Sequence, residues 1–180
     1  LSWNEAVVVQ PPVEDLGYGY RSKSWHLFPT ERLDPIAVPR TPGRVRASQF
    51  AYDQTNVCYT AEDVEREWTH RFDEFVRCGN PVVVPPRTEI RFLWDFEDYY
   101  CGYPMLETDG GADAKIRWAW AESLYNVKIE GDIHANRGHR DAFLGKVNLR
   151  SMYDTFLPDG RSGACFTVPW WKSGRWVEIS

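Results

Sequence analysis

This sequence predicts an all-β fold, an antiparallel β-sandwich of the jelly-roll or concanavalin-like type with one short helix before it. The chain of 180 residues carries nine Trp, nine Tyr and nine Phe, and aromatic side chains favour the pleated, half-buried surface of strands. From residue 82 onward, short segments of alternating apolar and polar residues are separated by turn signals. Several short strands spaced in this way are typical of sandwiches and barrels.

The first stretch, residues 1–56, is predicted to be irregular or weakly strand-forming. Its prolines, each of which restricts its own backbone and that of the preceding residue, stand at positions 11, 12, 29, 35, 39 and 42. Its Trp, Tyr and Phe content is too high for a disordered tail. We therefore interpret residues 1–56 as the end of a preceding domain or a linker wrapped over the sandwich, and expect the sandwich domain over residues 57–180.

One helix is predicted, over residues 60–77. Thr60 can cap its start, with Asp63 three residues later as a short variant of the capping box. Apolar residues then recur at a spacing of three to four, at Val64, Trp68, Phe72, Phe75 and Val76. The segment Gly79-Asn80-Pro81 ends the pattern. Period-two alternation, and hence a strand, is the alternative interpretation.

Strands are predicted from residue 82 to the end. The candidate segments are the Val run between Pro81 and Pro86, Glu89 to Phe96, Tyr103 to Thr108, Lys115 to Trp120, and Arg175 to Ile179. Residues 115–120 form the clearest half-buried strand, and we expect Ile116, Trp118 and Trp120 to share its inner face. Glycine tolerates positive φ, so Asp109-Gly110-Gly111 and Pro158-Asp159-Gly160 predict turns.

Composition argues against two classes of partner. The net charge is -5 with acids and bases interspersed, so no basic footprint for nucleic acid is present. No apolar run approaches the roughly 18 residues that a membrane span needs, and the first residues do not resemble a signal peptide. The chain opens in Leu1-Ser2-Trp3-Asn4 without an initiator Met, which suggests a trimmed or mature chain. The compartment stays open, with a periplasmic or extracellular one favoured over the cytoplasm.

The sequence offers no obvious catalytic, metal or cofactor site. Glycoside hydrolysis needs two carboxylic groups about the scissile bond, and the candidates are Asp95, Glu97, Asp98, Glu107 and Glu122, which sequence alone cannot pair. Asp132 with His134, and His139 with Asp141, have the spacing of metal ligands on a strand, although a polar loop is favoured. The four cysteines show no CxxC pair, so two disulfides and buried free thiols both stay open, at Cys58, Cys78, Cys101 and Cys165. We therefore predict no catalytic residue, no metal and no cofactor.

Several segments together resemble the sandwich that precedes the catalytic barrel in bacterial α-L-rhamnosidases. Residues 91–126 contain an extended segment, Gly102-Tyr103-Pro104, a strand, a Gly-rich turn and a strand closing in Ala-Glu-Ser-Leu-Tyr. The later segments are Asn136-Arg137-Gly138-His139-Arg140, Phe156-Leu157-Pro158-Asp159-Gly160 and residues 169–179. The likeness covers about residues 82–180. Lys172 stands where the family has Arg, and Trp176 stands where it has Tyr.

The resemblance implies a role without catalysis. In such enzymes, acidic residues of an (α/α)6 barrel C-terminal to the sandwich carry the reaction. We therefore expect this chain to be a non-catalytic domain of an α-L-rhamnosidase-like glycoside hydrolase. Its partner would be that barrel, which it would support while shaping the substrate entrance.

Two alternatives remain. A carbohydrate-binding module for rhamnose-containing glycans would use aromatic rings near turns, of which the candidates are Tyr99, Tyr100, Trp170 and Trp171. A small self-contained glycosidase would need two carboxylates in one cleft. Because neighbours on a strand point to opposite faces, we expect one of Trp170 and Trp171 to be core and the other to lie outside. Arg175 is a candidate to stack on an indole ring.

Overall fold

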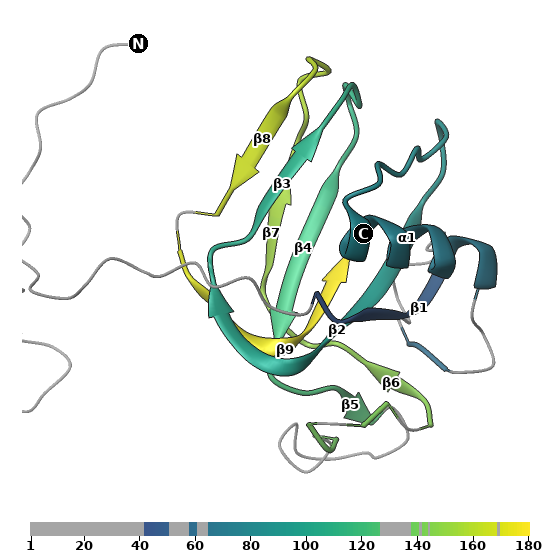
Figure 1. Cartoon of the computed structure of the whole chain (residues 1–180), viewed down its shortest axis with the longest axis vertical. Helices are drawn as coiled ribbons and strands as arrows, with labels where there is room; N and C mark the ends of the chain where they lie inside the picture. Colours follow the sequence, from purple (N-terminus) through teal and green to yellow (C-terminus); the bar gives the residue numbers. More distant parts are fainter. Residues whose placement is uncertain are drawn as a thin grey trace, which may run out of the picture. The chain divides into compact units, whose positions relative to one another are not determined.

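Antiparallel strands are the main secondary structure of the described residues. The computed structural model describes residues 42–50, 58–60, 65–126, 138–140, 142–143, 145–168 and 170–180. These residues all belong to one unit, Arg40–Ser180, and contain nine strands and one helix (Figure 1). Every strand ladder among them is antiparallel. The predicted all-β class with one helix is therefore confirmed.

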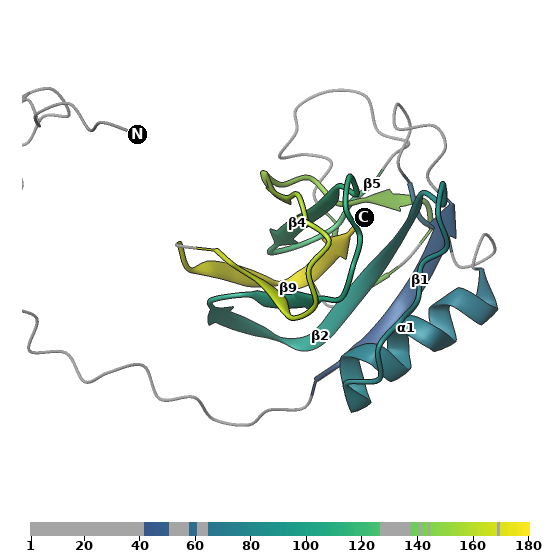
Figure 2. The same ribbon diagram turned by 90° about the horizontal axis from the view of Figure 1, so that it is seen from above.

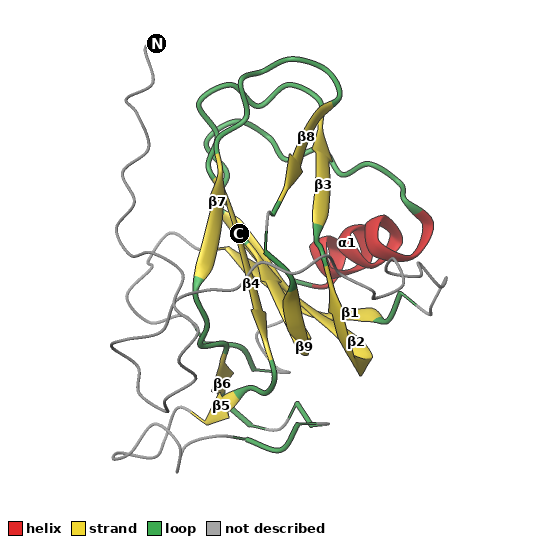
Figure 3. Ribbon diagram, turned by 90° about the vertical axis from the view of Figure 1, so that its left-hand side faces the viewer, coloured by secondary structure: helices red, strands yellow, loops and turns green. Residues whose placement is uncertain are grey.

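A five-stranded sheet forms the centre, in the order β1-β2-β9-β4-β7. Its strands are β1 (Arg44–Phe50), β2 (Ile90–Gly102), β9 (Lys172–Ile179), β4 (Ile116–Ala121) and β7 (Tyr153–Phe156). The last strand of the chain, β9, thus lies in the middle of the sheet. Two further ribbons pair β3 (Met105–Thr108) with β8 (Ala164–Thr167), and β5 (Tyr125–Asn126) with β6 (Val147–Asn148). The two ribbons lie toward opposite ends of the sheet (Figures 1 and 3).

One face of the sheet is covered by helix α1 (Arg66–Cys78) and the β3–β8 ribbon. The helix lies along β1 and β2 (Figure 2), where the ring of Phe72 stacks on Phe92 with centroids 4.2 Å apart. In the ribbon, Phe166 stacks on Phe156 of β7 at 5.0 Å. Phe72 and Phe92 belong to one hydrophobic cluster with buried side chains of β4 and β9, against which Leu106 of β3 also packs.

The opposite face of the sheet is also buried. Leu93, Ala119 and Trp176 point into a second cluster that includes Tyr59 and Leu124. Tyr59 joins β6 through two backbone hydrogen bonds with Val147, which fixes it over this face. The central strands therefore bury side chains on both faces, as strands between two covering layers do.

The predicted alternation of side chains along β4 is confirmed, but the prediction that one face of this strand is exposed to solvent is not. Ile116, Trp118 and Trp120 share the face toward the helix and the β3–β8 ribbon. The expected solvent side is wrong, because Ala119 is only 1% exposed and packs in the second cluster. A sandwich of two comparable sheets stays a prediction, since the described layer facing the sheet on one side consists of a helix and a two-stranded ribbon.

The helix is shorter at its start than predicted. It begins at Arg66 after Glu65, whose side chain makes no capping hydrogen bond, and Asp63 lies outside the described residues. Its predicted end is confirmed: Gly79 takes a left-handed φ of 72° and donates its N–H to the Phe75 carbonyl. Glycine suits this position because it lacks a Cβ.

Two strand boundaries differ from prediction. The Val82–Val84 run is not a strand and Val83 is 78% exposed, because the flanking prolines, Pro81, Pro85 and Pro86, lack the N–H that a ladder needs. Conversely, β1 lies within the stretch assigned to a tail or linker, yet pairs along β2. The sheet thus includes residues before 57, whereas the rest of the prediction for 1–41 and 51–57 lies outside the described residues.

The two predicted turns lie against each other. A Cβ on Gly111 would come within 3.7 Å of Pro158. Asp109 links the turns by accepting hydrogen bonds from the Ser162 hydroxyl at 2.6 Å and the Gly163 amide at 2.8 Å. These two bonds lower the pKa of Asp109. The β3–β4 and β7–β8 connections are therefore tied together at one end of the molecule.

A buried carboxylate anchors the second cluster. Glu178 of β9 is 1% exposed and accepts hydrogen bonds from the hydroxyls of Tyr59 and Tyr153, each at 2.6 Å. Burial, reinforced by the Glu178 charge, raises the pKa of both tyrosines above the usual value. Both hydroxyls thus stay protonated as donors far into alkaline solution.

We expect alkaline pH to destabilise the fold through these tyrosines. Their folded-state pKa values are raised, so their contribution is complete below the ordinary tyrosine pKa of about 10 and is lost as pH rises through the folded value. Tyr59→Phe should lower the free energy of unfolding by about 1.5–3 kcal/mol at neutral pH and flatten its decline above pH ~10. Urea unfolding measured across pH checks this, with the exposed Tyr103→Phe as control. An unchanged pH slope in Tyr59→Phe would contradict it.

Candidate functional site

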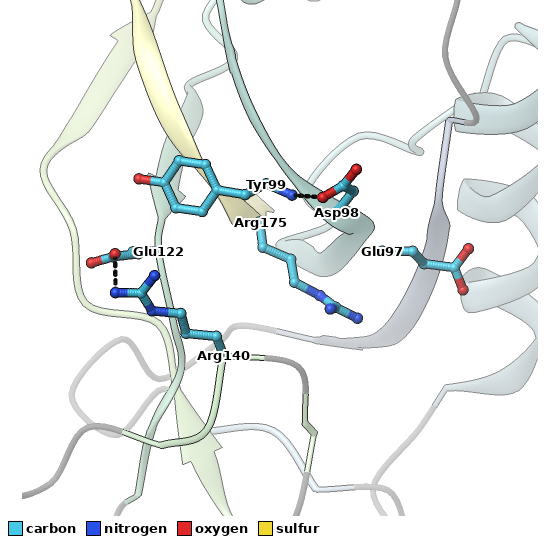
Figure 4. Close-up of a pocket in the computed structure, with 6 residues that line it drawn as sticks. All are labelled: Glu97, Asp98, Tyr99, Glu122, Arg140 and Arg175. Carbon is cyan, nitrogen blue, oxygen red and sulfur yellow. Dashed lines mark hydrogen bonds and ion pairs between the residues drawn. The ribbon is translucent and has the colours of Figure 1, made fainter.

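A polar cavity lies where β2 departs from its ladder with β9. Its volume is about 240 Å³, and its walls are formed by Glu97, Asp98, Tyr99, Glu122, Arg140 and Arg175 (Figure 4). These side chains come from β2, the residue after β4, the loop at 138–140, and β9. Four segments far apart in sequence thus meet at this point.

A bulge in β2 brings its residues into the cavity wall. The register with β9 shifts between Asp95 and Tyr100, and Glu97 takes a left-handed φ of 62°. The Asp95 carboxylate accepts a hydrogen bond from the Glu97 amide at 2.8 Å, which stabilises the turn of the chain. Residues released from a ladder by a bulge can aim side chains elsewhere, and here they border the cavity.

Asp95 is the buried centre of this region. Its side chain is 0% exposed, and the Arg175 guanidinium donates two hydrogen bonds to it, at 2.7 and 3.2 Å. Arg46 of β1 donates a third at 3.0 Å. Two-point pairing of a guanidinium with a carboxylate fixes geometry as well as charge. The buried Asp95 carboxylate thereby holds the Arg175 side chain at the cavity wall.

At Gly43 and Gly174 the backbone lies so close to another segment that only glycine fits. A Cβ on Gly174 would lie 2.3 Å from the Ala121 carbonyl oxygen, and one on Gly43 would lie 2.1 Å from that of Asp95. Both distances are far below van der Waals contact, and both residues have positive φ. Gly174 therefore allows β9 to lie close to the end of β4. Glu122, the residue that follows β4, lines the cavity.

The loop at 138–140 is fixed to the sheet by its backbone. Gly138 donates to the Leu124 carbonyl at 2.7 Å, and the buried Trp176 indole donates to the Arg140 carbonyl at 2.9 Å. The Arg140 guanidinium in turn pairs with Glu122 at 2.6 Å. The Arg175 guanidinium, which was predicted to lie near Trp171, is placed over the ring of Trp176, with its carbon 5.5 Å from the ring centroid.

The charges around the cavity largely compensate one another. Glu97 pairs with Arg44 at 2.9 Å, and Glu122 and Arg175 have the partners described above. Asp98 accepts a hydrogen bond from the Tyr99 amide at 2.7 Å. The walls thus present carboxylate acceptors, guanidinium donors and one phenol ring, a set suited to hydrogen bonding with hydroxyl groups.

The structure separates the two predicted tyrosines. Tyr99 lines the cavity and is 46% exposed, with its hydroxyl 3.4 Å from that of Ser173. Tyr100 is half-buried and packs edge-on against Phe96, with centroids 5.5 Å apart. Tyr99 is therefore available to a ligand, whereas Tyr100 belongs to the packing of the sheet.

The prediction that one of Trp170 and Trp171 is core is wrong. They are 67% and 48% exposed, because β9 begins only at Lys172 and the strand alternation does not reach them. Neither lines the cavity. Both side chains are exposed on the surface instead.

The remaining candidate residues are distributed as follows. Glu107 lies on β3 with its side chain exposed, outside the cavity lining. Asp132, His134 and Asp141 lie outside the described residues. All four cysteines are free; Cys58 is half-buried and the other three are exposed. In the described part of the chain, no group of three or more His, Cys, Asp and Glu is placed to hold a metal ion.

Comparison of the chain with protein-family models, curated proteins and solved structures finds no match in any of the three. Among the described residues, no helix is both long enough and apolar enough to cross a membrane.

We expect Asp95→Asn to be strongly destabilising. It removes the charge from a buried carboxylate that three guanidinium hydrogen bonds converge on, and breaking such a pair typically lowers stability by about 3–5 kcal/mol. The partial exposure of both arginines, 13% and 23%, favours the lower end. Urea unfolding measures this. The matched control is Asp98→Asn, an exposed carboxylate three residues on, which should change stability by less than about 0.5 kcal/mol. Equal effects of the two variants would contradict the role of Asp95.

Proposed function

We propose that this chain is a non-catalytic β-domain of an α-L-rhamnosidase-like glycoside hydrolase. Its role is to support a helical catalytic barrel and to shape the substrate entrance. The observation that carries the proposal is an exposed apolar surface at the edge of a domain whose central sheet is covered on both faces.

We call this surface the aromatic edge, defined by Tyr103, Met105, Trp170 and Trp171, which are 60%, 68%, 67% and 48% exposed. The segments that carry it run side by side. Gly102 pairs with Lys172 at one end and Met105 with Thr167 at the other. Large apolar side chains gathered at one place on a surface are typical of interfaces with another domain or protein. A helical barrel is the occupant that the family resemblance implies.

The segments that resemble the rhamnosidase sandwich support a structural role. They build β2, β4 and β9, which are adjacent strands of the central sheet, and β3 of the ribbon with β8. Lys172, where the family has Arg, pairs with Asp154 of β7 at 2.7 Å. Lys172 thus keeps a positive charge at this position and connects β9 with β7 of the same sheet.

The engagement of the carboxylates supports a role without catalysis. Three candidates for an acid or base, Asp95, Glu97 and Glu122, are each ion-paired with an arginine. Glycoside hydrolysis needs two carboxyl groups that flank the scissile bond, whereas these three carboxylates are engaged in ion pairs within the fold.

A carbohydrate-binding module for rhamnose-containing glycans is the second candidate. It is favoured by the exposure of Tyr99, Trp170 and Trp171, since aromatic faces bind sugar rings and a few polar groups orient them. This function requires the isolated chain to bind sugar, whereas the first does not.

The isolated chain should not hydrolyse rhamnosides. The assay is the release of nitrophenol from 4-nitrophenyl α-L-rhamnopyranoside, with a bacterial α-L-rhamnosidase as positive control. We expect no release above buffer. Turnover by the chain that disappears in Glu122→Gln or Asp98→Asn would contradict the non-catalytic role.

The aromatic edge should carry binding to a helical barrel. We expect the chain to associate with the (α/α)6 catalytic barrel of a bacterial α-L-rhamnosidase in analytical ultracentrifugation, and Trp170→Ala with Trp171→Ala to weaken this at least tenfold, as for aromatic anchors of interfaces. Because both rings are exposed, the variants should unfold within about 0.5 kcal/mol of the parent chain. The control is Met152→Ala, an exposed apolar residue in the β6–β7 connection. Undiminished association in the double Trp variant would contradict the assignment of this surface.

A further inference from the structure

We infer that the cavity between the β2 bulge and the 138–140 loop binds one neutral pyranose ring, stacked on Tyr99 and hydrogen-bonded by the Glu122–Arg140 pair. The inference deepens the proposed function and rests on it for the choice of a sugar as ligand. It assigns sugar contact to the cavity rather than to the aromatic edge.

The position of Tyr99 supplies an apolar platform. Tyr99 is 46% exposed as a residue, and its ring lies beside the Glu122–Arg140 pair in the cavity wall (Figure 4). The chain around it is fixed, because the Asp98 carboxylate accepts the Tyr99 amide hydrogen and Asp95 accepts that of Glu97. An aromatic ring held by its backbone in this way needs little ordering when a ligand stacks on it.

The polar groups of the Glu122–Arg140 pair are held in place by other parts of the fold before a ligand binds. The buried Trp176 indole fixes the Arg140 carbonyl at 2.9 Å, and Glu122 fixes the Arg140 guanidinium at 2.6 Å. A carboxylate accepts hydrogen bonds and a guanidinium donates them. Side by side, the two groups suit a vicinal diol, one hydroxyl of which donates to Glu122 while the next accepts from Arg140.

The charge and the volume of the cavity restrict the kind of ligand that it can bind. Glu97, Glu122 and Arg175 each face a partner of opposite charge. Among the residues that the structure describes, Asp98 is the charge of the lining that has no ion-pair partner. An anionic ligand would therefore be repelled. The volume of about 240 Å³ lies below the range of roughly 300–1,000 Å³ for drug-sized ligands. A single uncharged sugar ring fits these limits better than an oligosaccharide or a uronic acid.

The test is a titration of the full chain with methyl α-L-rhamnopyranoside, followed by backbone amide shifts of Asp98, Tyr99 and Arg140 in ¹H–¹⁵N NMR. We expect saturable shifts with a millimolar Kd, as for a small site. Tyr99→Ala should weaken binding about two- to tenfold through the lost ring contact, and Arg140→Gln should weaken it by a similar factor. Tyr103→Ala is the matched control, an exposed tyrosine outside the cavity lining, and should leave the Kd unchanged.

Several results would overturn the inference. Absence of saturable shifts at these amides in the folded chain would do so, as would equal loss in Tyr99→Ala and Tyr103→Ala. Tighter binding of D-galacturonate or D-glucosamine than of the neutral sugar would show that charge governs the site. Failure here is distinguishable from failure of the proposed function, because barrel association is tested with variants of Trp170 and Trp171, which lie outside the cavity lining. Sugar binding without barrel association would leave the cavity assigned and favour the binding module.

Discussion

The pairing of a buried Asp95 with two arginines is the interaction on which the centre of this structure depends. Arg46 comes from β1, Asp95 from β2 and Arg175 from β9, so one carboxylate ties three adjacent strands together. The Asp95 carboxylate also accepts a hydrogen bond from the Glu97 amide, at the point where β2 stops pairing with β9. A buried carboxylate is tolerated only where donors surround it, and here those donors also define the bend of the strand.

The bend separates two surfaces with different chemistry. Before β2 and β9 resume pairing, the chain turns Tyr99 toward a polar cavity with Glu122 and Arg140. After they resume, the paired segments lead to the aromatic edge at Trp170 and Trp171. Glycines at 43 and 174 allow the close backbone approach that this arrangement needs. A small polar cavity and an exposed apolar surface are the two features on which the proposed accessory role rests.

Sequence patterns predicted the local features well where they depend on neighbouring residues. The alternation in β4 and the glycine end of α1 are both present, since they follow from backbone geometry. The exposure of the strand faces could not be predicted from sequence. Ala119 alternates with apolar residues and is therefore expected to face solvent, whereas a second covering layer buries it. The cavity also escaped prediction. Its Glu122–Arg140 pair joins residues through a loop fixed by Trp176, and no spacing in the sequence signals such a contact.

The account is tested most directly by a double-mutant cycle of Asp95→Asn and Arg175→Gln, with the free energy of unfolding measured for all four proteins. If the pair organises the junction of β2 and β9, the second substitution should cost much less once the first is present, giving a coupling energy above about 1 kcal/mol. Additive effects, with a coupling energy near zero, would show that the two residues act independently. The bulge, and the cavity that it borders, would then need another physical cause.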